Sequence, residues 1–466
     1  GFKDDQVFSS DVKNAQLESP SEEDITVEAV SNSTGGQDLK FSWPVVYGAG
    51  GYEFSLYNVD DAENPVVVGE ENQVIDGCSV IRARAEDTKY KVVVKTLGNE
   101  KLNNTAAEEP TTMAYTTLVP VFQTIPTGTD LAAFFTANPI QPADKATEIV
   151  YELAPGGEYT MSGNVELKST NITLRADKLN RANLTVNGDA SFVSDGAGFR
   201  MKWINIDATN YTGSALIQYN STIDETNPFV IYDSGNAPWV VVEATSGIES
   251  SNIKGINKPF IADNGKKYAL RNFTFKDCVV EMGANFSGSF INFKGALIKE
   301  LSLVNSTVYN LNENYDAFWA VYAQVQVIQV ADRVVWATEK GSINILNSTL
   351  WKLSYAKKGI FNANAWGKTS NSVTVKNSII EDCGSQMVLR YFKMNNDAVA
   401  GYFANNTYWY DGAFAELEIT DSKGDKTGTE LRDDPGFKDP ANGDFTVSGA
   451  AQIEKRTGDP RWLPAQ

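Results

Sequence analysis

One short pattern of apolar and polar positions returns five times between Arg271 and Tyr410. In each copy apolar residues recur at every second position and an Asp or Asn follows, although Gly401 replaces the first apolar residue of the last copy. The Asp or Asn positions are Asp277, Asn305, Asn347, Asn377 and Asn405, which lie 28, 42, 30 and 28 residues apart. Self-similarity at such a period predicts a stack of structural repeats, a solenoid.

The alternation within each copy predicts short strands rather than helices. Apolar residues at every second position give a strand with one buried face, whereas an amphipathic helix would repeat at i, i+3 and i+4. One short strand cannot bury its face alone, but a stack of strands can. Asn tolerates the left-handed backbone of a sharp bend, and a column of Asn at strand bends is typical of right-handed parallel β-helices. We therefore predict an all-β fold dominated by a right-handed single-stranded parallel β-helix, with an irregular β-sandwich as the alternative.

Residues 18–118 carry a different pattern. Short apolar segments separated by polar turns predict a β-sandwich; they are Leu39–Trp43, Gly51–Tyr57 and Thr88–Asn99. Trp43 early in this region, and Tyr90 ahead of a Val-rich strand, resemble the fibronectin type III pattern. The resemblance implies a binding module or a spacer, and we expect Trp43 in its core. The polar, acidic residues 1–17 are interpreted as a flexible tether.

The remaining residues, 119–466, are assigned to the stack of strands. Thr129–Asn138 has an N-cap candidate and apolar residues at helical spacing, which predicts a short helix that caps the open end of the stack. The segments Asn171–Ala176 and Trp203–Ala208 are interpreted as earlier copies of the repeat, with Ala in the Asn position. The register of residues 215–270 is not fixed by their pattern.

The interval between Asn305 and Asn347 exceeds its neighbours by 12 to 14 residues. The surplus falls between Asn310 and Gly341 and is rich in aromatic residues, namely Tyr315, Trp319, Tyr322 and Trp336. Insertions in solenoids form loops or extra strands, often on the face that binds a ligand.

Composition excludes several classes of function. The 466 residues carry a net charge of −19, which argues against nucleic acid as a partner, because phosphate binding needs clustered Lys and Arg. Histidine is absent, and this excludes Ser-His-Asp triads, Cys-His dyads and His-ligated zinc. The chain has three cysteines, a small and odd number that does not indicate a disulfide framework. No apolar run approaches the roughly 18 residues of a membrane span.

The end of the chain carries a specific motif, Asp-Pro-Gly-Phe-Lys-Asp-Pro-Ala-Asn-Gly-Asp-Phe over residues 434–445, followed by Gly458–Trp462. It resembles the segment that closes many pectate-lyase-like (pectin-lyase-like) β-helices. With the sandwich and the Asn repeats, the whole chain resembles surface lipoproteins of gut Bacteroidetes, in which a fibronectin-like domain precedes a pectate-lyase-like β-helix of unassigned function. The resemblance implies polysaccharide handling at the cell surface. That resemblance implies an exported protein, outer-membrane-anchored or extracellular. The start at Gly1, without an initiator Met or signal peptide, is interpreted as a trimmed form whose lipid anchor has been removed.

A second column lies four residues after each Asp or Asn, and its members are Glu281, Tyr309, Trp351, Glu381 and Trp409. The residue before each member is apolar, so we expect this column to point outward. Exposed aromatic faces at strand spacing suit sugar rings, and the carboxylates could bind hydroxyl groups or hold Ca²⁺ through oxygen ligands. Tyr391 is expected nearby as a further substrate-binding residue. The alternative is that these aromatic residues pack beneath terminal loops.

A polysaccharide lyase is a sharper hypothesis. The family resemblance implies carboxylate-bound Ca²⁺ and an Arg or Lys base, and a base needs hydrogen-bond reach to the proton it removes. The basic candidates are Arg390 and Lys393, and the candidate Ca²⁺ ligands are Glu381, Asp382 and Asp316. The dense Asp cluster typical of Ca²⁺-dependent lyases is missing from the sequence. A hydrolase would need a pair of carboxylates about 5–10 Å apart, which sequence cannot locate.

These observations favour a monomeric cell-surface protein that binds a plant or host polysaccharide such as pectin without cleaving it. The expected partner is the glycan, with no nucleic acid and with membrane contact only through a lipid anchor. No cofactor is certain, and Ca²⁺ is the one candidate. The alternatives are a polysaccharide lyase that acts by β-elimination on a uronate polymer, and a structural or adhesive surface protein.

Overall fold

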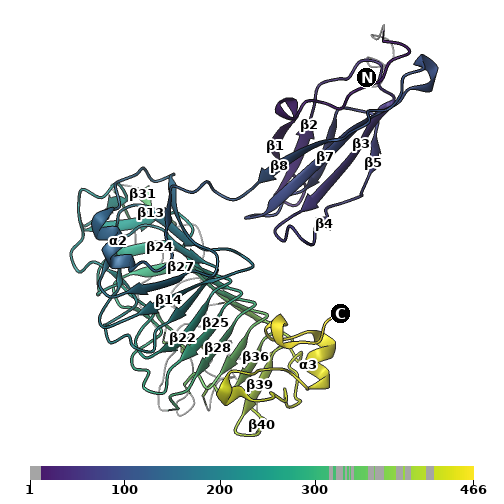
Figure 1. The fold of residues 1–466 in the computed structure, drawn as a ribbon. Helices are drawn as coiled ribbons and strands as arrows, with labels where there is room; N and C mark the ends of the chain where they lie inside the picture. Colours follow the sequence, from purple (N-terminus) through teal and green to yellow (C-terminus); the bar gives the residue numbers. More distant parts are fainter. Residues whose placement is uncertain are drawn as a thin grey trace. The chain divides into compact units, whose positions relative to one another are not determined.

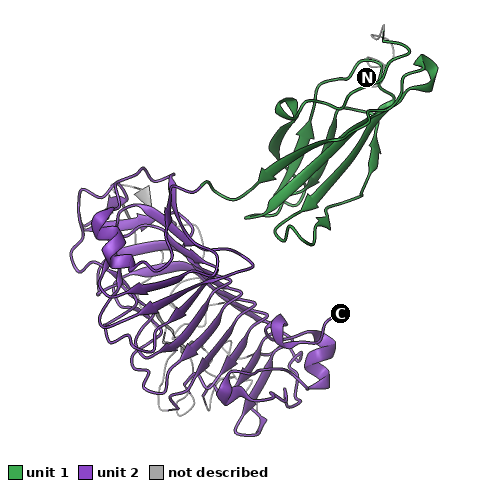
Figure 2. Ribbon diagram, viewed as in Figure 1, with its two compact units in different colours: residues 1–120 green, residues 121–466 purple. Residues whose placement is uncertain are grey.

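The computed structural model describes residues 12–313, 319–321, 329–330, 333–334, 336, 341–354, 361–362, 372–384, 392–393, 400–415 and 425–466. The chain divides into two compact units, Gly1–Pro120 and Val121–Gln466 (Figure 2). Strands dominate both units (Figure 1). No helix among the described residues is long and apolar enough to cross a membrane.

The first unit consists of two antiparallel sheets that share one core. The smaller sheet has the order β1 (Thr26–Ser31), β2 (Gln37–Ser42) and β6 (Ser79–Ala83). The larger has the order β4 (Val66–Val67), β3 (Gly51–Asn58), β7 (Lys89–Leu97) and β8 (Thr111–Thr116), and β5 (Gln73–Ile75) also pairs with β3. Trp43 is 4% exposed and stacks on Phe54 at 5.9 Å between ring centroids, so its predicted place in the core is confirmed.

The second unit is built from three large parallel sheets that the chain visits in rotation (Figure 1). The twelve-stranded sheet contains β9 (Gln123–Ile125), β10 (Glu148–Leu153), β13 (Asn171–Arg175), β16 (Phe199–Lys202), β19 (Val230–Tyr232), β20 (Pro238–Val242), β21 (Gly247–Glu249), β24 (Tyr268–Lys276), β27 (Leu297–Val304), β32 (Ser342–Leu346), β35 (Ser372–Lys376) and β38 (Ala400–Ala404).

The ten-stranded sheet contains β11 (Glu158–Met161), β14 (Ala182–Val186), β17 (Ile204–Asp207), β22 (Asn252–Ile256), β25 (Val279–Met282), β28 (Thr307–Asn310), β33 (Thr349–Trp351), β36 (Ile379–Glu381), β39 (Thr407–Tyr410) and β40 (Ala413–Phe414). The eight-stranded sheet contains β12 (Val165–Lys168), β15 (Phe192–Ser194), β18 (Ile217–Tyr219), β23 (Ile261–Ala262), β26 (Ile291–Phe293), β29 (Trp319–Val321), β34 (Phe361–Asn362) and β37 (Phe392–Lys393). One strand from each sheet in turn makes one circuit of the chain.

The predicted register of the five repeats is confirmed. Leu303 pairs with Phe275 on one side and with Ile345 on the other, and the column continues through Val375 to Phe403. These side chains are buried inside the stack. The Asp and Asn residues that follow have φ between +48° and +55°, the left-handed bend that the repeat predicts.

A second ladder lies one residue beyond these bends, and the repeat pattern alone did not reveal it. The Ser306 N–H donates to Ser348 Oγ at 3.3 Å, the Ser348 N–H to Ser378 Oγ at 3.2 Å, and the Ser378 N–H to Asn406 Oδ1 at 3.0 Å. Cys278 occupies the same position and donates its N–H to Ser306 Oγ. The members from Ser306 to Asn406 are fully buried, so each hydroxyl satisfies a backbone donor that water cannot reach.

The two ends of the stack carry short helices (Figure 1). The predicted cap helix is present as α2 (Leu131–Ala137), and the Asp130 side chain accepts its N-terminal Ala133 N–H at 3.2 Å. Near the other end lies α3 (Ala450–Lys455), within the residues that follow the last circuit.

The assignment of the earlier copies needs a correction. Asn171–Arg175 is β13 of the twelve-stranded sheet, but Ile204–Asp207 is β17 of the ten-stranded sheet, so the two are not copies of one position. The strand that follows β13 in its own sheet is β16, whose Phe199 and Met201 pair with Ile172 and Leu174. Both strands alternate with the same period, and that period does not say to which sheet a strand belongs.

Candidate functional site

The outward column predicted from the repeats lies on the ten-stranded sheet in the expected register. Tyr309 pairs with Glu281 on one side and with Trp351 on the other, and Glu381 follows Trp351 and pairs with Trp409. The Tyr309 hydroxyl donates to the Glu281 carboxylate at 2.6 Å. The five side chains are therefore brought together as one stripe.

The middle of this stripe is covered by the end of the chain. Tyr309 is only 5% exposed and Trp351 only 6%, and the fully buried Phe445 packs on both, at 5.2 and 5.9 Å between ring centroids. Phe437 and Trp462 complete the cluster. The expectation that Tyr309 and Trp351 offer open aromatic faces to sugars is therefore wrong. Their side chains point away from the stack, as predicted, but the motif of residues 434–445 packs over them.

Polar contacts fix this cover in place. The Thr307 hydroxyl donates to Asp459 Oδ2 at 2.7 Å and accepts the Trp462 indole N–H at 2.7 Å. Arg461 bonds Asp459 at 2.8 Å and reaches Asp277, in the first of the five repeats, also at 2.8 Å. The closing segment is thus attached across several circuits of the stack.

The far end of the stripe is half-buried. Burial, with the nearby charges of Asp382 and Asp434, raises the pKa of Glu381 to about 7. Burial also raises the pKa of Asp382, which accepts the Asp411 N–H at 2.8 Å. Trp409 is likewise half-buried. In the part of the chain that the structure describes, no three carboxylate or thiol groups are placed to hold a metal ion together.

Four of the predicted site residues lie outside the described residues or are described only in part. Arg390, Tyr391 and Asp316 fall outside the described residues. Lys393 is described only through its backbone, as the last residue of β37. The base and part of the Ca²⁺ set of the lyase hypothesis therefore stay predictions.

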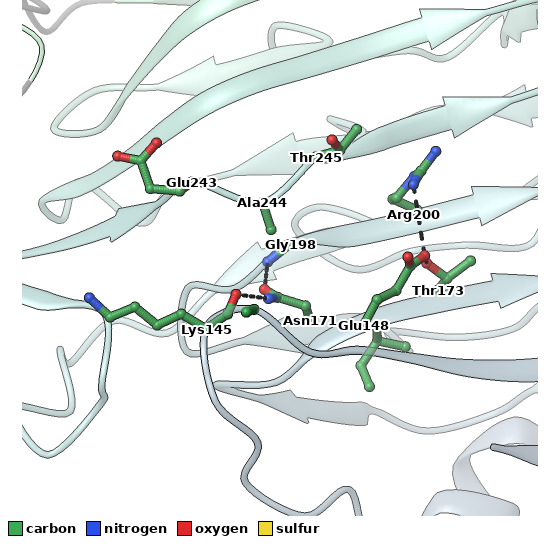
Figure 3. A pocket seen from close by; sticks show the side chains of 11 residues that line it. Lys145, Glu148, Asn171, Thr173, Gly198, Arg200, Glu243, Ala244 and Thr245 are labelled. Carbon is green, nitrogen blue, oxygen red and sulfur yellow. Dashed lines mark hydrogen bonds and ion pairs between the residues drawn. The ribbon is translucent and has the colours of Figure 1, made fainter. Parts of the chain in front are cut away.

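A cleft of about 330 Å³ opens instead on the twelve-stranded sheet (Figure 3). Strands β10, β13 and β16 contribute Glu148, Thr173 and Arg200, whose side chains lie close together. The other lining residues come from the flanking loops and strand ends and are Lys145, Ala146, Asn171, Ile172, Gly198, Glu243, Ala244 and Thr245.

An interruption in the strands produces this cleft. Strands β20 and β21 both pair with the long strand β24, and residues 243–246 step between them. Opposite the step lies Gly198, where an added Cβ would stand 2.9 Å from the Ala244 Cβ and 3.2 Å from the Thr245 carbonyl oxygen. A glycine here therefore keeps the floor of the cleft open.

Two insertions meet beside the cleft. The first is the antiparallel hairpin β19–β20, which the chain adds to one circuit. The second belongs to the surplus seen between Asn310 and Gly341: it includes the hairpin β30 (Gln329–Val330) and β31 (Arg333–Val334), and β30 lies beside β19. Trp336 of this insertion donates its indole N–H to the lining residue Glu243 at 3.0 Å and packs against Arg271, whose guanidinium lies 5.3 Å from the ring centroid.

The charged groups at the cleft compensate one another. The Arg200 guanidinium lies between two carboxylates, 3.7 Å from Glu148 and 4.0 Å from Glu249. Glu148 accepts a hydrogen bond from the Thr173 hydroxyl, and Glu243 pairs with Arg271. Asn171 fixes the floor, because its amide donates to the Lys145 carbonyl at 3.0 Å and accepts the Gly198 N–H at 2.8 Å. The cleft therefore presents hydrogen-bonding groups to a ligand, and its net charge is small because the charged side chains pair with one another.

Sequence reasoning missed this cleft because one of its sides, residues 243–245, lies within residues 215–270, whose register the sequence pattern does not fix. The signal that could have found it is the long interval between β17 and β22, which exceeds the usual spacing of the repeats and contains the Trp239 strand β20. Trp336 is one of the aromatic residues of the other insertion, but nothing in the sequence places it beside Glu243.

Comparison with known protein families gives matches to parts of the chain, and none of them carries an activity. Three family models match, and each is described as a domain of unknown function: DUF4992 over residues 1–156, DUF4957 over residues 157–311 and DUF5123 over residues 343–462. No curated protein matches the chain. The three matched regions lie in a chain whose secondary structure is mostly β-strand. None of the three family descriptions names a substrate.

Proposed function

We propose that this chain is an exported, monomeric surface protein that binds polysaccharide without cleaving it, through the cleft on the twelve-stranded sheet. In this proposal residues 121–466 form a right-handed parallel β-helix of the pectate-lyase-like type. The first unit is a fibronectin type III-like spacer that follows a lipid anchor, as in the surface lipoproteins of gut Bacteroidetes. The glycan is the partner, nucleic acid takes no part, and Ca²⁺ is the one candidate cofactor.

One observation carries the proposal: two insertions break an otherwise regular stack at the same place, and a polar cleft opens there. Insertions in solenoids commonly build the binding face. The polar lining groups are an arginine, glutamates, threonines, an asparagine and a lysine, beside small and apolar residues. They are the donors and acceptors that hydroxyl-rich ligands need. The covered stripe at Tyr309 and Trp351 cannot serve a glycan in the same way, because Phe445 lies on it.

The lyase alternative rests on a different set of residues. It requires a base such as Arg390 or Lys393 and a metal held by carboxylates, and Glu381 and Asp382 are the described members of that set. Neither the side chains of the candidate bases nor Asp316 are among the described residues, so the lyase stays the alternative that an activity assay decides.

Affinity electrophoresis on a panel of neutral and acidic plant and host glycans tests the proposal. We expect retarded migration on at least one glycan, with no rise in the ultraviolet absorbance of unsaturated product when Ca²⁺ is present. Product formation would establish the lyase, and alanine variants of Arg390 and Lys393 would then identify the base. Unchanged migration on every glycan would overturn the proposal and favour the structural or adhesive alternative.

A further inference from the structure

The Arg200 guanidinium has unused hydrogen-bonding capacity at the cleft. Its ion pairs of 3.7 and 4.0 Å are longer than the roughly 2.7–3.2 Å of a hydrogen bond. Among the residues that the structure describes, this side chain has no hydrogen bond, although a guanidinium carries five N–H donors. The Arg200 side chain is 23% exposed, so the protein shields most of it from water. The same side chain lines the cleft.

Acceptors lie directly beside these donors. Glu148 receives one hydrogen bond, from Thr173, and an ionised carboxylate has about four acceptor sites. Thr245 is exposed on the opposite side of the cleft. A ligand that bridges Arg200 and Glu148 must therefore accept from one group and donate to its neighbour. A hydroxyl does both, and two hydroxyls on adjacent carbons present this combination twice.

An anionic ligand fits this place poorly. A carboxylate that accepted from Arg200 would stand beside Glu148 and Glu249, and like charges at such distances repel each other. Of the nearby cations, Arg200 and Arg271 are already paired with carboxylates, and Lys202 pairs with Glu249. Lys145 also lines the cleft, but its side chain extends away from Arg200 (Figure 3). The chain as a whole carries a net charge of −19 and repels polyanions at longer range.

We propose that the cleft is a site for an uncharged sugar with vicinal hydroxyl groups, recognised by the Arg200–Glu148 pair, and not for a uronate. This inference rests on the proposed function and specifies its substrate class. The cleft volume of about 330 Å³ lies at the lower end of the roughly 300–1,000 Å³ of ligand pockets, so it takes a short stretch of the glycan. Since no aromatic residue is among the described residues that line it, hydrogen bonds and not ring stacking give it specificity.

A matched pair of polymers tests the charge preference directly. Polygalacturonate and its carboxyl-reduced form share a backbone and differ only in the carboxyl group, and a panel of neutral xylan, galactan, mannan and β-glucan extends the comparison. We expect the chain to bind neutral polymers, with the reduced polymer bound more tightly than its parent. Binding should change little between roughly 50 and 500 mM NaCl, because salt screens charge–charge attraction and not hydroxyl hydrogen bonds.

Two substitutions test the Arg200–Glu148 pair, and the first has effects of opposite sign on the two ligand classes. Glu148→Gln removes a negative charge, so it should weaken the binding of a neutral sugar and strengthen that of a uronate. Arg200→Gln should weaken neutral binding by about tenfold or more, given the usual strength of hydrogen bonds to charged groups. Arg432→Gln is the matched control, because Arg432 is exposed, pairs with Glu430 and does not line the cleft.

The possible outcomes distinguish the preference for a neutral sugar from the proposed binding of glycans at the cleft. Tighter binding of polygalacturonate than of its reduced form, together with stronger binding by Glu148→Gln, would overturn the neutral-sugar inference and leave glycan binding standing. If the Arg200 variant does not fold, as circular dichroism would show, Ala146→Trp fills the cleft from an exposed position instead. Glycan binding that survives Ala146→Trp, or no binding to any polymer, would overturn both.

Discussion

Two outer faces of the same stack differ in their exposure: one is covered by another part of the chain, and the other is open. On the ten-stranded sheet, the stripe that contains Tyr309 and Trp351 is buried beneath Phe445. On the twelve-stranded sheet, the residues around Arg200 stay open as a cleft. Both sets occupy outward positions of parallel strands. The difference lies in what the chain adds on top: a closing segment that covers one face, and two insertions that border an opening on the other.

This contrast separates two meanings of an outward position. The alternation of a strand shows which side chains leave the interior of the stack, but it says nothing about a segment that arrives about a hundred residues later. Aromatic residues at regular spacing were the most attractive candidates for sugar binding in the sequence. In the structure, two of them are the core of a cover, and the polar cleft has no comparable signature.

The largest expected effect comes from removing the centre of the cover. Phe445→Ala deletes a fully buried ring from the cluster with Tyr309 and Trp351, so it should cost about 3–5 kcal/mol of unfolding free energy. Denaturant unfolding followed by tryptophan emission measures it. Phe122→Ala, at a residue that is 62% exposed, is the control and should change little. Equal stability of the two variants would mean that the cover does not pack as described.

The buried serine ladder should give the next largest effect. Ser348→Ala leaves the buried Ser306 N–H without its acceptor, and an unsatisfied buried donor costs about 1–3 kcal/mol. The same unfolding experiment measures it, with the exposed Ser221→Ala as control. A Ser348 variant as stable as the control would show that the ladder contributes nothing to holding the circuits together.

A smaller, pH-dependent effect is expected at the edge of the cover. The pKa of Glu381 is raised from its ordinary 4.5 to about 7, so the folded chain binds this proton more tightly than the unfolded chain does. Its stabilising contribution is complete below about 4.5 and is lost as the pH rises through about 7. Glu381→Gln should therefore match the parent near pH 4 and be more stable at pH 8, by about 1 kcal/mol after allowance for solvent.

Thermal unfolding at both pH values measures this difference, with the exposed Glu454→Gln as control. A Glu381→Gln chain that is less stable than the parent at pH 8 would contradict the assigned direction. It would show that the ionised carboxylate, and not the neutral acid, is the form that the fold prefers.

The repeats made much of the fold predictable. Where alternation, spacing and bend chemistry agreed, as from Asp277 to Asn405, the register of the parallel strands is as expected. Where only alternation was present, as at Ile204–Asp207, the strand was assigned to the wrong sheet. Period 2 identifies a strand, but a bend residue such as Trp203, at φ 60°, is needed to place it in a circuit, and tryptophan is not an expected bend residue.

The candidate site was far less predictable. The cleft depends on Gly198 facing the step at Ala244, and on Trp336 reaching Glu243 from a position 93 residues away in sequence. Neither contact follows from a local pattern, because each depends on how an insertion folds back on the stack. The closing motif of residues 434–445 was recognised, but the surface that it covers could be seen only once the strands were placed.

The central claim, that glycans bind at the open cleft and not at the aromatic stripe, is tested most directly by two variants run side by side in affinity electrophoresis. Ala146→Trp fills the cleft, and Trp409→Ala removes the half-buried aromatic residue at the end of the stripe. We predict that Ala146→Trp loses the retardation shown by the parent chain, while Trp409→Ala keeps it. Loss of retardation by Trp409→Ala alone would return the site to the ten-stranded sheet and contradict this account.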